Sequence, residues 1–545
     1  MMKKRLVMSL LAGILMVSSA VPVLAAPKRM EDGTIFDAQY YGAANPDVAA
    51  ALGTDEITLY THYVMNGKYE GRKPCEDGAV PEGETSVALI DSILIETQER
   101  VVSTNYNRYY YSANVSPISQ FFDIFGNLNI VYDGVNDFYI AILDSNGAVI
   151  NTIKIAKRYP LLGGVAYADN HYYVVYGKQN MTADGNQVVM SVSKYDVWGN
   201  YLDEVTYTGD ETCPYDGIKW GTKIPFDAGN CDILIHNNVL VCSYAREMYS
   251  GHQSNHVLYV DINQMSKLRT APSYTSHSFD QRVIVTSNGS YLFADHGDAY
   301  ERGFNITKIS PGEKDIWKNG EFTSFHFREG ANRDHGYNET YAQLGDIAET
   351  SVGYVLAASS EETLSRDVAP TNTTYAGYSE ARNLFIQILK KDFDLRSGAD
   401  CFAVAGKTRV AQGTPIPNPL TEMWLPKDAV DYGVIWLTDY EDNYYCASPK
   451  MVVTNDDRIV LLWEKYAYQS NVWYDDEFID SYIMILKNDG TILQNATSLS
   501  GKRLDANEDI LYKDNCLYWA TSVENEWSKI QVNRLYLDLY TTVKK

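Results

Sequence analysis

A short unit of two β-strands joined by a polar turn recurs along most of this chain, and it restricts the fold more than any other feature. Runs rich in Val, Ile, Tyr and Leu alternate with turn residues, as in β-hairpins. Regular recurrence of one such unit is typical of repeat architectures. The unit lies at residues 165–177, 231–245, 282–295, 345–360, 449–465 and 508–522, with a weaker copy that begins near Phe121.

A second recurring unit follows the first at a variable distance and joins two strands through an Asp- or Gly-containing turn. Examples are AILDSNGAVINTIKI, VSKYDVWGNYLDEVTY and MILKNDGTILQNATSL. Alternation of the two units gives four-stranded blades, whose radial repetition closes the structure and protects the strand edges. We therefore predict an all-β fold, a β-propeller of about seven four-stranded blades over residues 87–545. Strands within 87–101 are expected to complete its last blade near residues 535–539. A pair of β-sandwiches or two smaller β-domains is the alternative.

The turn Tyr/Leu-Asp-x-x-Gly-Asn/Ala within these hairpins resembles a turn of secreted bacterial β-propellers. This resemblance implies the fold and no particular enzyme family.

Residues 1–26 have the order of features of a secretory signal peptide. Lys3-Lys4-Arg5 precedes an apolar stretch from Leu6 to Leu24, and Val23-Leu24-Ala25 fits a cleavage site. No later segment approaches the ~20 apolar residues that a membrane-spanning helix needs. We expect a bacterial protein that is secreted, extracellular or associated with the cell surface, without membrane insertion after signal cleavage.

Residues 35–74 are rich in Ala and place apolar residues at helical spacing, which predicts a small α-helical module. Asn45-Pro46-Asp47 favours a helix start, because Pro is tolerated in the first turn. The groups Phe36-Asp37-x-x-Tyr40-Tyr41, Asn45-Pro46-Asp47-Val48, His62-Tyr63 and Gly67-Lys68-x-x-Gly71-Arg72 resemble a short helical repeat of surface-associated bacterial proteins. The resemblance implies a role in surface attachment. Residues 75–86 then read as a linker.

The chain is acidic, with a formal net charge of −24. Nucleic-acid binding relies on clustered Lys and Arg, so we expect no nucleic-acid partner. The seven cysteines include no Cys-x-x-Cys pair, which argues against a structural zinc site.

The path of the chain through a blade sorts its connections into two sets. If strands A to D run up and down, the A–B and C–D turns share one end of the propeller, and the B–C and D–A connections share the other. The first set is expected to be short and the second long. Most of the unusual residues fall in the second set. The ligand-binding candidates there are His252, His256, His277, Asp280, Arg282, His296, Asp298, Arg302, Arg333, His335 and Glu339, whereas His326 is expected in a strand. The alternative is that these side chains only hydrogen-bond the loops to one another.

Three carboxylates, Asp232, Asp346 and Asp509, each precede Ile at the start of a predicted strand A. In a propeller they would approach the central channel, where they could bind Ca²⁺ or another divalent metal. Equally, each could tie one blade to the next through backbone amides.

These residues lead to two functional hypotheses. The first is recognition of a polysaccharide or a surface protein through the end with long connections. The second is an extracellular hydrolase or lyase acting on carbohydrate through the His, Asp and Arg residues of that end. No zincin, nucleophile-elbow, phosphate-loop or sialidase motif occurs, so no catalytic residue is assigned. Substitution of His296 and Asp298 is expected to abolish ligand contact and to leave folding intact.

Overall fold

The computed structural model describes most of the chain beyond the predicted signal peptide. The described residues are 27–30, 32–75, 79, 84–102, 114–182, 184–213, 217–227, 229–270, 274–297, 303–314, 322–327, 342–362, 381–393, 398–410, 430–441, 443–468, 476–523 and 526–544. The chain divides into two compact units, of which the larger is Val87–Thr541.

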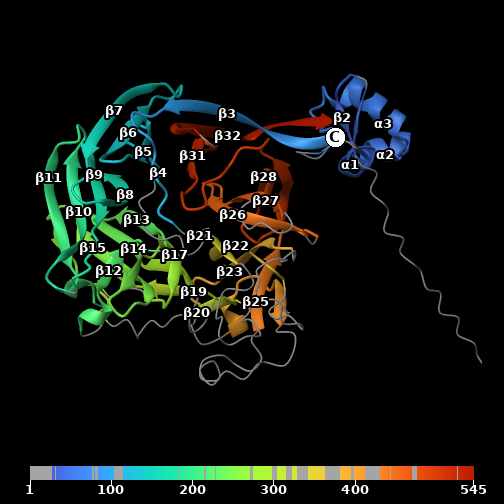
Figure 1. Cartoon of the computed structure of the whole chain (residues 1–545). Coiled ribbons are helices and arrows are strands. Elements are labelled where there is room, and N and C mark those ends of the chain that lie inside the picture. Colours follow the sequence, from blue (N-terminus) through green and yellow to red (C-terminus); the bar gives the residue numbers. More distant parts are fainter. Residues whose placement is uncertain are drawn as a thin grey trace, which may run out of the picture. The chain divides into compact units, whose positions relative to one another are not determined.

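The larger unit is a β-propeller of seven blades, as the sequence predicts. The blades follow one another around a ring in chain order (Figure 1). Each is built on four antiparallel strands, here called A to D. Blade 1 contains β4 (Ile118–Phe122), β5 (Leu128–Asp133), β6 (Asp137–Leu143) and β7 (Val149–Ala156). Blade 2 contains β8 (Leu161–Ala168), β9 (His171–Gly177), β10 (Val188–Asp196) and β11 (Tyr201–Thr208). Blade 4 contains β17 (Ser278–Val285), β18 (Tyr291–Gly297), β19 (Gly303–Ile309) and β20 (Phe322–His326). Blade 6 contains β26 (Tyr444–Val453), β27 (Ile459–Ala467), β28 (Glu477–Leu486) and β29 (Ile492–Ser498).

Blades 3 and 5 carry an additional strand each. Blade 3 contains β13 (Cys231–His236), β14 (Val239–Met248), β15 (Gln253–Asp261) and β16 (Ser266–Lys267), with β12 (Thr222–Pro225) paired to the end of β14. Blade 5 contains β21 (Gln343–Glu349), β22 (Tyr354–Ser360), β23 (Asn383–Leu389) and β25 (Val430–Trp436), with β24 (Lys407–Val410) paired to β25.

Blade 7 joins strands from both ends of the propeller sequence. Its strands A to C are β30 (Leu511–Lys513), β31 (Cys516–Val523) and β32 (Glu526–Lys544), and its fourth strand is β3 (Glu84–Glu96). The expected closure of the last blade by an early strand is therefore confirmed. A strand from one terminus that completes a blade at the other terminus closes the ring, because β3 supplies the strand that blade 7 would otherwise lack beside β32.

Each seam between neighbouring blades holds its own cluster of buried apolar side chains. Val131 and Ile153 of blade 1 pack with Val165 and Val174 of blade 2, and the remaining six seams are filled in the same way. The core is thus divided among the seams, as expected when each blade can bury its faces only against its two neighbours.

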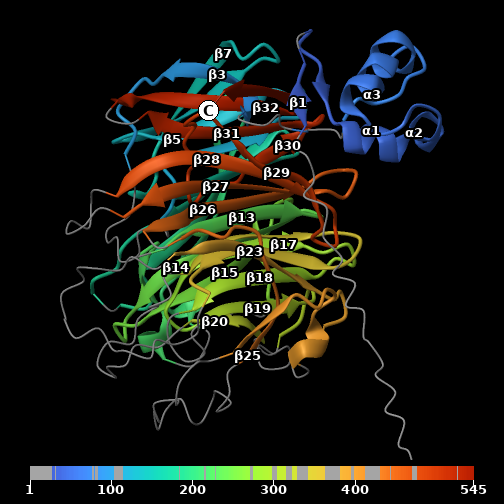
Figure 2. The same cartoon turned by 90° about the vertical axis from the view of Figure 1, so that its right-hand side faces the viewer.

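The strands run between two ends of the propeller, which Figure 2 shows from the side. The A–B and C–D turns lie at one end, named here the hairpin end. Asp169 and Asn170 join β8 to β9 with φ of 47° and 61°, the left-handed conformations that a two-residue hairpin turn requires. In the Asp-x-x-Gly turns, an Asp side chain accepts from two backbone amides, as Asp144 does from Asn146 N and Ala148 N, both at 2.9 Å.

The B–C and D–A connections lie at the opposite end, named here the loop end. The expectation that all C–D turns are short is wrong for two blades. In blade 4 this connection spans residues 310–321, and in blade 5 it spans residues 390–429 and includes β24. Residues of β24 and β25 reach the loop end, where Arg409 donates to the carbonyl of Glu361 at 3.0 Å.

The helical residues near the N-terminus are α1 (Ala38–Ala44), α2 (Pro46–Leu52), α3 (Glu56–His62) and a single π-turn, η1 (Tyr63–Gly67). The hairpin of β1 (Lys28–Arg29) and β2 (Ile35–Phe36) precedes them. Tyr41 lies at their centre, its hydroxyl 3.0 Å from His62 Nδ1. A Cβ at Gly67 would collide with that hydroxyl. Arg72 closes the group by pairing with Asp47 at 2.8 Å. These motif residues hold the helices together.

Three short 3₁₀ turns, η2 (Asp210–Thr212), η3 (Ile218–Trp220) and η4 (Gly398–Cys401), complete the secondary structure that is described. Within the part of the chain that the structure describes, no helix is long and apolar enough to cross a membrane.

Candidate functional site

Three neighbouring A strands are irregular at the same level of the propeller. The pairing of the A and B strands shifts register between Ser278 and Gln281, between Leu344 and Ile347, and between Ala447 and Lys450. Bulges of this kind redirect a side chain and are frequent beside functional sites. Here they place Asp280, Asp346 and Lys450 in one buried polar cluster on the inner strands, named here the axial cluster.

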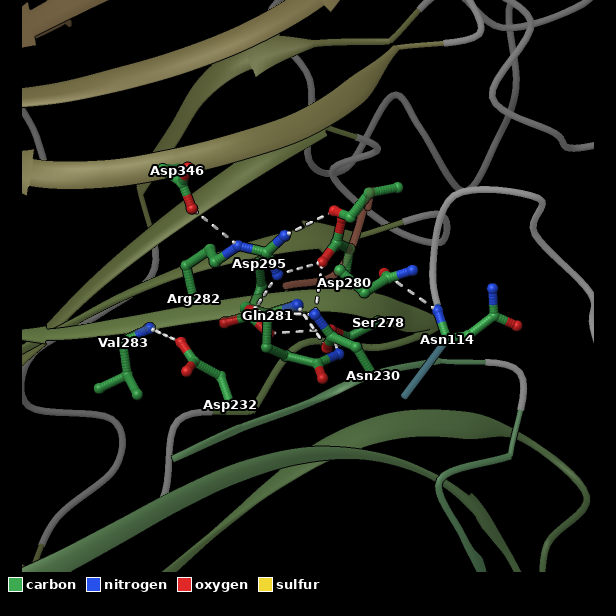
Figure 3. Close-up of polar contacts among 12 residues, drawn as sticks. Asn114, Asn230, Asp232, Ser278, Asp280, Gln281, Arg282, Val283, Asp295 and Asp346 are labelled. Atoms are coloured by element: carbon green, nitrogen blue, oxygen red, sulfur yellow. Dashed lines mark hydrogen bonds and ion pairs between the residues drawn. The ribbon is translucent and has the colours of Figure 1, made fainter. Parts of the chain in front are cut away.

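Arg282 is the centre of the axial cluster (Figure 3). Its Nη1 donates to Asp280 Oδ1 at 2.6 Å and to the carbonyl of Gln281 at 2.8 Å. Its Nε donates to Asp346 Oδ1 in blade 5 at 3.2 Å, and its Nη2 donates to the carbonyl of Ala506 at 3.3 Å. One guanidinium therefore joins blades 4 and 5 to the segment that enters blade 7.

Carboxylates of the A strands also bind the backbone of the following blade. Val283 N donates to Asp232 Oδ2 at 2.6 Å, and Met451 N donates to Asp346 Oδ2 at 2.7 Å. The third such bond, from Gln120 N to Glu508 Oε1 at 2.9 Å, joins blade 7 to blade 1. Two of the three aspartates considered as metal ligands thus tie blades together, as the alternative reading of the sequence had it. The third tie uses Glu508 rather than its neighbour Asp509.

The axial cluster contains more acids than bases. Arg282 and Lys450 face Asp232, Asp280, Asp346, Glu508 and Asp509. Lys450 is fully buried, and its Nζ makes no hydrogen bond with the described residues. Among the described residues, Lys450 influences Asp280, Glu508 and Asp509 through space and not through a direct contact.

Burial shifts the titration of these acids. Burial, together with the nearby Asp509 carboxylate, raises the pKa of Asp232 to about 7. Burial also raises the pKa of Asp280 to about 6, although Arg282 and Lys450 oppose the rise. The pKa of Glu508 is raised by burial and by Asp509. A cluster with surplus carboxyl groups retains protons that isolated carboxyls would release.

The residues of the cluster do not form a metal centre. Among the described residues, no group of three or more His, Cys, Asp or Glu side chains is arranged to hold a metal ion. Of the proposed trio, Asp232 and Asp346 are occupied by backbone amides, and Arg282 lies against Asp346. A calcium site would need several oxygens free to converge on one point.

Two of the candidate histidines lie inside the propeller and not in loops. His256 is in β15 and 6% exposed, and His296 is in β18 and fully buried. Burial lowers the pKa of both imidazoles, that of His296 to about 3. The rings of Phe279, Phe304 and Phe327 surround His296 with centroid distances of 4.8 to 6.3 Å. Asp280 and Arg282 are also buried, so these four candidates belong to the framework.

Two other candidate histidines lie together at the loop end. His252 precedes β15 and is exposed, and His277 precedes β17 and is half-buried. Their Nδ1 and Nε2 atoms are 3.2 Å apart. His277 N also donates to the carbonyl of Gln253 at 3.0 Å, which fastens this connection to blade 3. The remaining candidates, Asp298, Arg302, Arg333, His335 and Glu339, lie outside the described residues.

Aromatic and cationic side chains gather at the loop end of blade 6. Tyr444 begins β26, Tyr466 lies near the end of β27, Tyr468 follows that strand, and Phe478 lies in β28, and all four are at least partly exposed. Lys465 Nζ lies 4.2 Å from the ring centroid of Tyr444, and Arg503 lies 4.2 Å from that of Phe478. We name these six residues the blade 6 patch. The sequence analysis named none of these six residues as candidates.

The sequence analysis placed His326 in a strand and assigned it no role. His326 ends β20, and its Nδ1 lies 2.7 Å from Asp431 Oδ1 of β25. The second oxygen of Asp431 accepts from Arg409 Nε at 2.9 Å. The partners are 105 residues apart, and no short motif marks either one.

The comparisons with known proteins establish nothing beyond the fold. No family model matches this chain, and no curated protein matches it. Solved structures resemble it only distantly. A protein of unknown function from Dyadobacter fermentans is 11% identical, with 84% of this chain and 99% of that chain covered and a TM-score of 0.33. Drosophila Plexin A in complex with Semaphorin 1b is 10% identical over 81% and 88%, with a TM-score of 0.34. An exo-1,5-alpha-L-arabinanase from a bovine ruminal metagenomic library is 12% identical over 60% and 94%, with a TM-score of 0.26. At this level of likeness, none of them bears on what this chain binds or catalyses.

Proposed function

We propose that this protein is an exported recognition propeller that binds an acidic extracellular glycan through its loop end. The observation that carries the proposal is the blade 6 patch, in which partly exposed Tyr and Phe rings alternate with Lys465 and Arg503. Aromatic faces stack on the apolar faces of sugar rings, and guanidinium groups bind carboxylates or sulfates through paired hydrogen bonds.

The patch has the rigidity that a binding site needs. Arg503 Nε donates to the buried Glu464 carboxylate at 2.8 Å, and Tyr466 donates its hydroxyl to the same carboxylate at 2.9 Å. Beside the patch, Arg382 lies 4.0 Å from the ring centroid of Tyr445, and Arg382 Nε donates to the Tyr468 hydroxyl at 3.1 Å. Side chains held in one conformation lose little entropy on binding.

The negative net charge of the protein means that an acidic glycan can be attracted only locally, at the cations of the patch, and not by the protein as a whole. A chain with a net charge of −24 repels polyanions at long range, so binding of an acidic glycan depends on the few cations at this patch. The exposed His252 and the half-buried His277 beside it add imidazole groups at the loop end of blades 3 and 4.

Retention of the mature chain, residues 27–545, on neutral, uronic and sulfated polysaccharides tests the proposal. We expect the chain to be retained on an acidic polymer, and we expect this retention to weaken as the salt concentration rises. The substitutions Tyr444→Ala and Lys465→Gln should each reduce retention about tenfold or more. Trp198→Ala is the matched control, because Trp198 is an exposed aromatic residue at the hairpin end. Retention on no polymer would overturn the proposal and favour a surface protein as the ligand. Equal loss in the control would show that the patch is not the site.

A further inference from the structure

We propose that His252 and His277 bind a divalent metal ion of the group Ni²⁺, Cu²⁺ and Zn²⁺ at the loop end of blades 3 and 4. The observation behind this is that Nδ1 of His252 lies 3.2 Å from Nε2 of His277. The first residue lies between β14 and β15 of blade 3, and the second directly precedes β17 of blade 4. Metal binding goes beyond glycan recognition and does not depend on it, because it uses none of the residues of the blade 6 patch.

The separation of the two nitrogen atoms suits chelation of a single ion. Imidazole nitrogens lie about 2.0–2.1 Å from such an ion, at angles of about 90–110° to one another, so two of them lie about 2.8–3.4 Å apart. The observed 3.2 Å falls within this range. Without an ion, the same contact is a hydrogen bond in which one neutral imidazole donates to the other. An ion that replaces the shared hydrogen needs only a small rotation of the exposed His252 ring, because the two nitrogens are already at a chelating distance.

The backbone at His252 is fixed by a tight turn between β14 and β15. Gly251 N donates to the carbonyl of Met248 at 2.9 Å, and Met248 N donates to the carbonyl of His252 at 2.8 Å. Gly251 has a φ of 83°, which glycine adopts without strain. Ser250 N fastens the turn to the carbonyl of Lys219 at 2.9 Å. The exposed imidazole of His252 is therefore carried by a backbone with one defined position.

His277 is held against the same part of blade 3. Its backbone N donates to the carbonyl of Gln253 at 3.0 Å, and the preceding Ser276 forms a β-bridge with Ser254. The φ of His277 is 50°, in the left-handed region that residues other than glycine seldom adopt. Such conformations persist where surrounding contacts fix them, and they are frequent at ligand sites. Two imidazoles brought together before binding lower the entropic cost of holding an ion.

The donor atoms determine which class of ion is bound. Imidazole nitrogen suits Ni²⁺, Cu²⁺ and Zn²⁺, whereas Ca²⁺ and Mg²⁺ prefer oxygen ligands. Among the described residues, no third His, Cys, Asp or Glu side chain joins the pair. A closed structural zinc site has four protein ligands, so an ion held by two keeps positions that water or a carboxylate of a ligand can occupy. The net charge of −24 raises the concentration of cations around the protein and favours binding.

Calorimetric titration of the untagged mature chain, treated with EDTA and dialysed, tests the proposal with Cu²⁺, Ni²⁺, Zn²⁺ and Ca²⁺. We expect one saturable site per chain for each of the first three ions, with Cu²⁺ bound most tightly and Ca²⁺ not bound. His252→Ala should abolish this site, because a single imidazole cannot chelate an ion. His277→Asn should do the same and preserve the backbone, since Asn tolerates a positive φ. Thermal unfolding of each variant checks that it is folded.

His171→Ala is the matched control, since Nδ1 of this hairpin-end histidine lies 2.6 Å from the backbone carbonyl of Asp169. Electron paramagnetic resonance of the Cu²⁺ complex should show coupling to two imidazole nitrogens in the wild type and in this control. The same coupling should be lost in His252→Ala and in His277→Asn. The proposal is overturned by the absence of saturable binding, by a site that either of these two substitutions leaves intact, or by equal loss in the control. Retention on polysaccharide, measured with EDTA present, tests the glycan site separately.

Discussion

Asp346 and Arg282 hold two blades together, because Arg282 Nε of blade 4 donates to Asp346 Oδ1 of blade 5 at 3.2 Å. The other oxygen of Asp346 accepts from Met451 N of blade 6 at 2.7 Å. One carboxylate thus fixes three consecutive blades at the axis. In a fold whose core is divided among seams, such a contact couples elements that otherwise touch only their neighbours.

Replacement of Asp346 by Ala should destabilise the propeller by about 3–5 kcal/mol, since it leaves the buried guanidinium of Arg282 with an incomplete set of partners. Chemical denaturation monitored by Trp fluorescence measures the change. Lys154→Ala provides the comparison, because the exposed Lys154 forms a surface ion pair with Asp137 at 2.8 Å that is worth about 1 kcal/mol or less. Equal effects of the two substitutions would mean that the axial cluster does not couple the blades.

Stability should fall as pH rises through the range in which the axial carboxyls lose their protons. The pKa of Asp232 is raised to about 7, whereas an unfolded Asp titrates near 3.9. Between these values the folded state holds a proton that the unfolded state has released, so this contribution is full at low pH and lost as pH rises toward 7. Asp232→Asn keeps an acceptor for Val283 N and cannot titrate. Its stability relative to the wild type should therefore increase between about pH 4 and about pH 7. A difference that does not change with pH would show that Asp232 has an ordinary pKa.

Much of the fold follows from local sequence. The turn Asp169-Asn170 favours the positive φ values that a tight hairpin needs, and the structure has them. The ring closure follows from an excess strand before blade 1, which must pair with an incomplete last blade. Each of these inferences needs only neighbouring residues or a count of strands.

The site could be predicted only in part, for two physical reasons. First, bulges in the A strands break the two-residue alternation, so the pattern could not show that Asp280 and Lys450 point into one cluster. Second, some of the polar contacts join residues that are distant in the sequence, such as His326 and Asp431. His256 and His296 were expected in loops because they follow the predicted ends of B strands; both lie in strands, where burial keeps them neutral.

Replacement of His296 by Ala should cost about 2–5 kcal/mol, contrary to the expectation from sequence that the fold would be unaffected. Its imidazole is fully buried and lies against three Phe rings, so truncation leaves a cavity. His252→Ala, which removes an exposed histidine at the same end, should stay within about 0.5 kcal/mol. Thermal unfolding of both variants measures the contrast. If His296→Ala were as stable as the wild type, His296 would not be needed for folding, and the sequence prediction that it contacts a ligand would stand.

Removal of β3 should open the ring. A chain that begins at residue 97 lacks the fourth strand of blade 7, so β32 would present an unpaired edge. It would also lose Ile95, which is 4% exposed in the seam between blades 7 and 1. Unpaired edges promote association between chains, so this variant should form oligomers or aggregates in size-exclusion chromatography with light scattering. A chain that begins at residue 84 retains β3 and lacks only the residues before it, and it should remain monodisperse. If both truncations behaved alike, the closure of blade 7 by β3 would not be what holds the propeller together, and the seams alone would suffice.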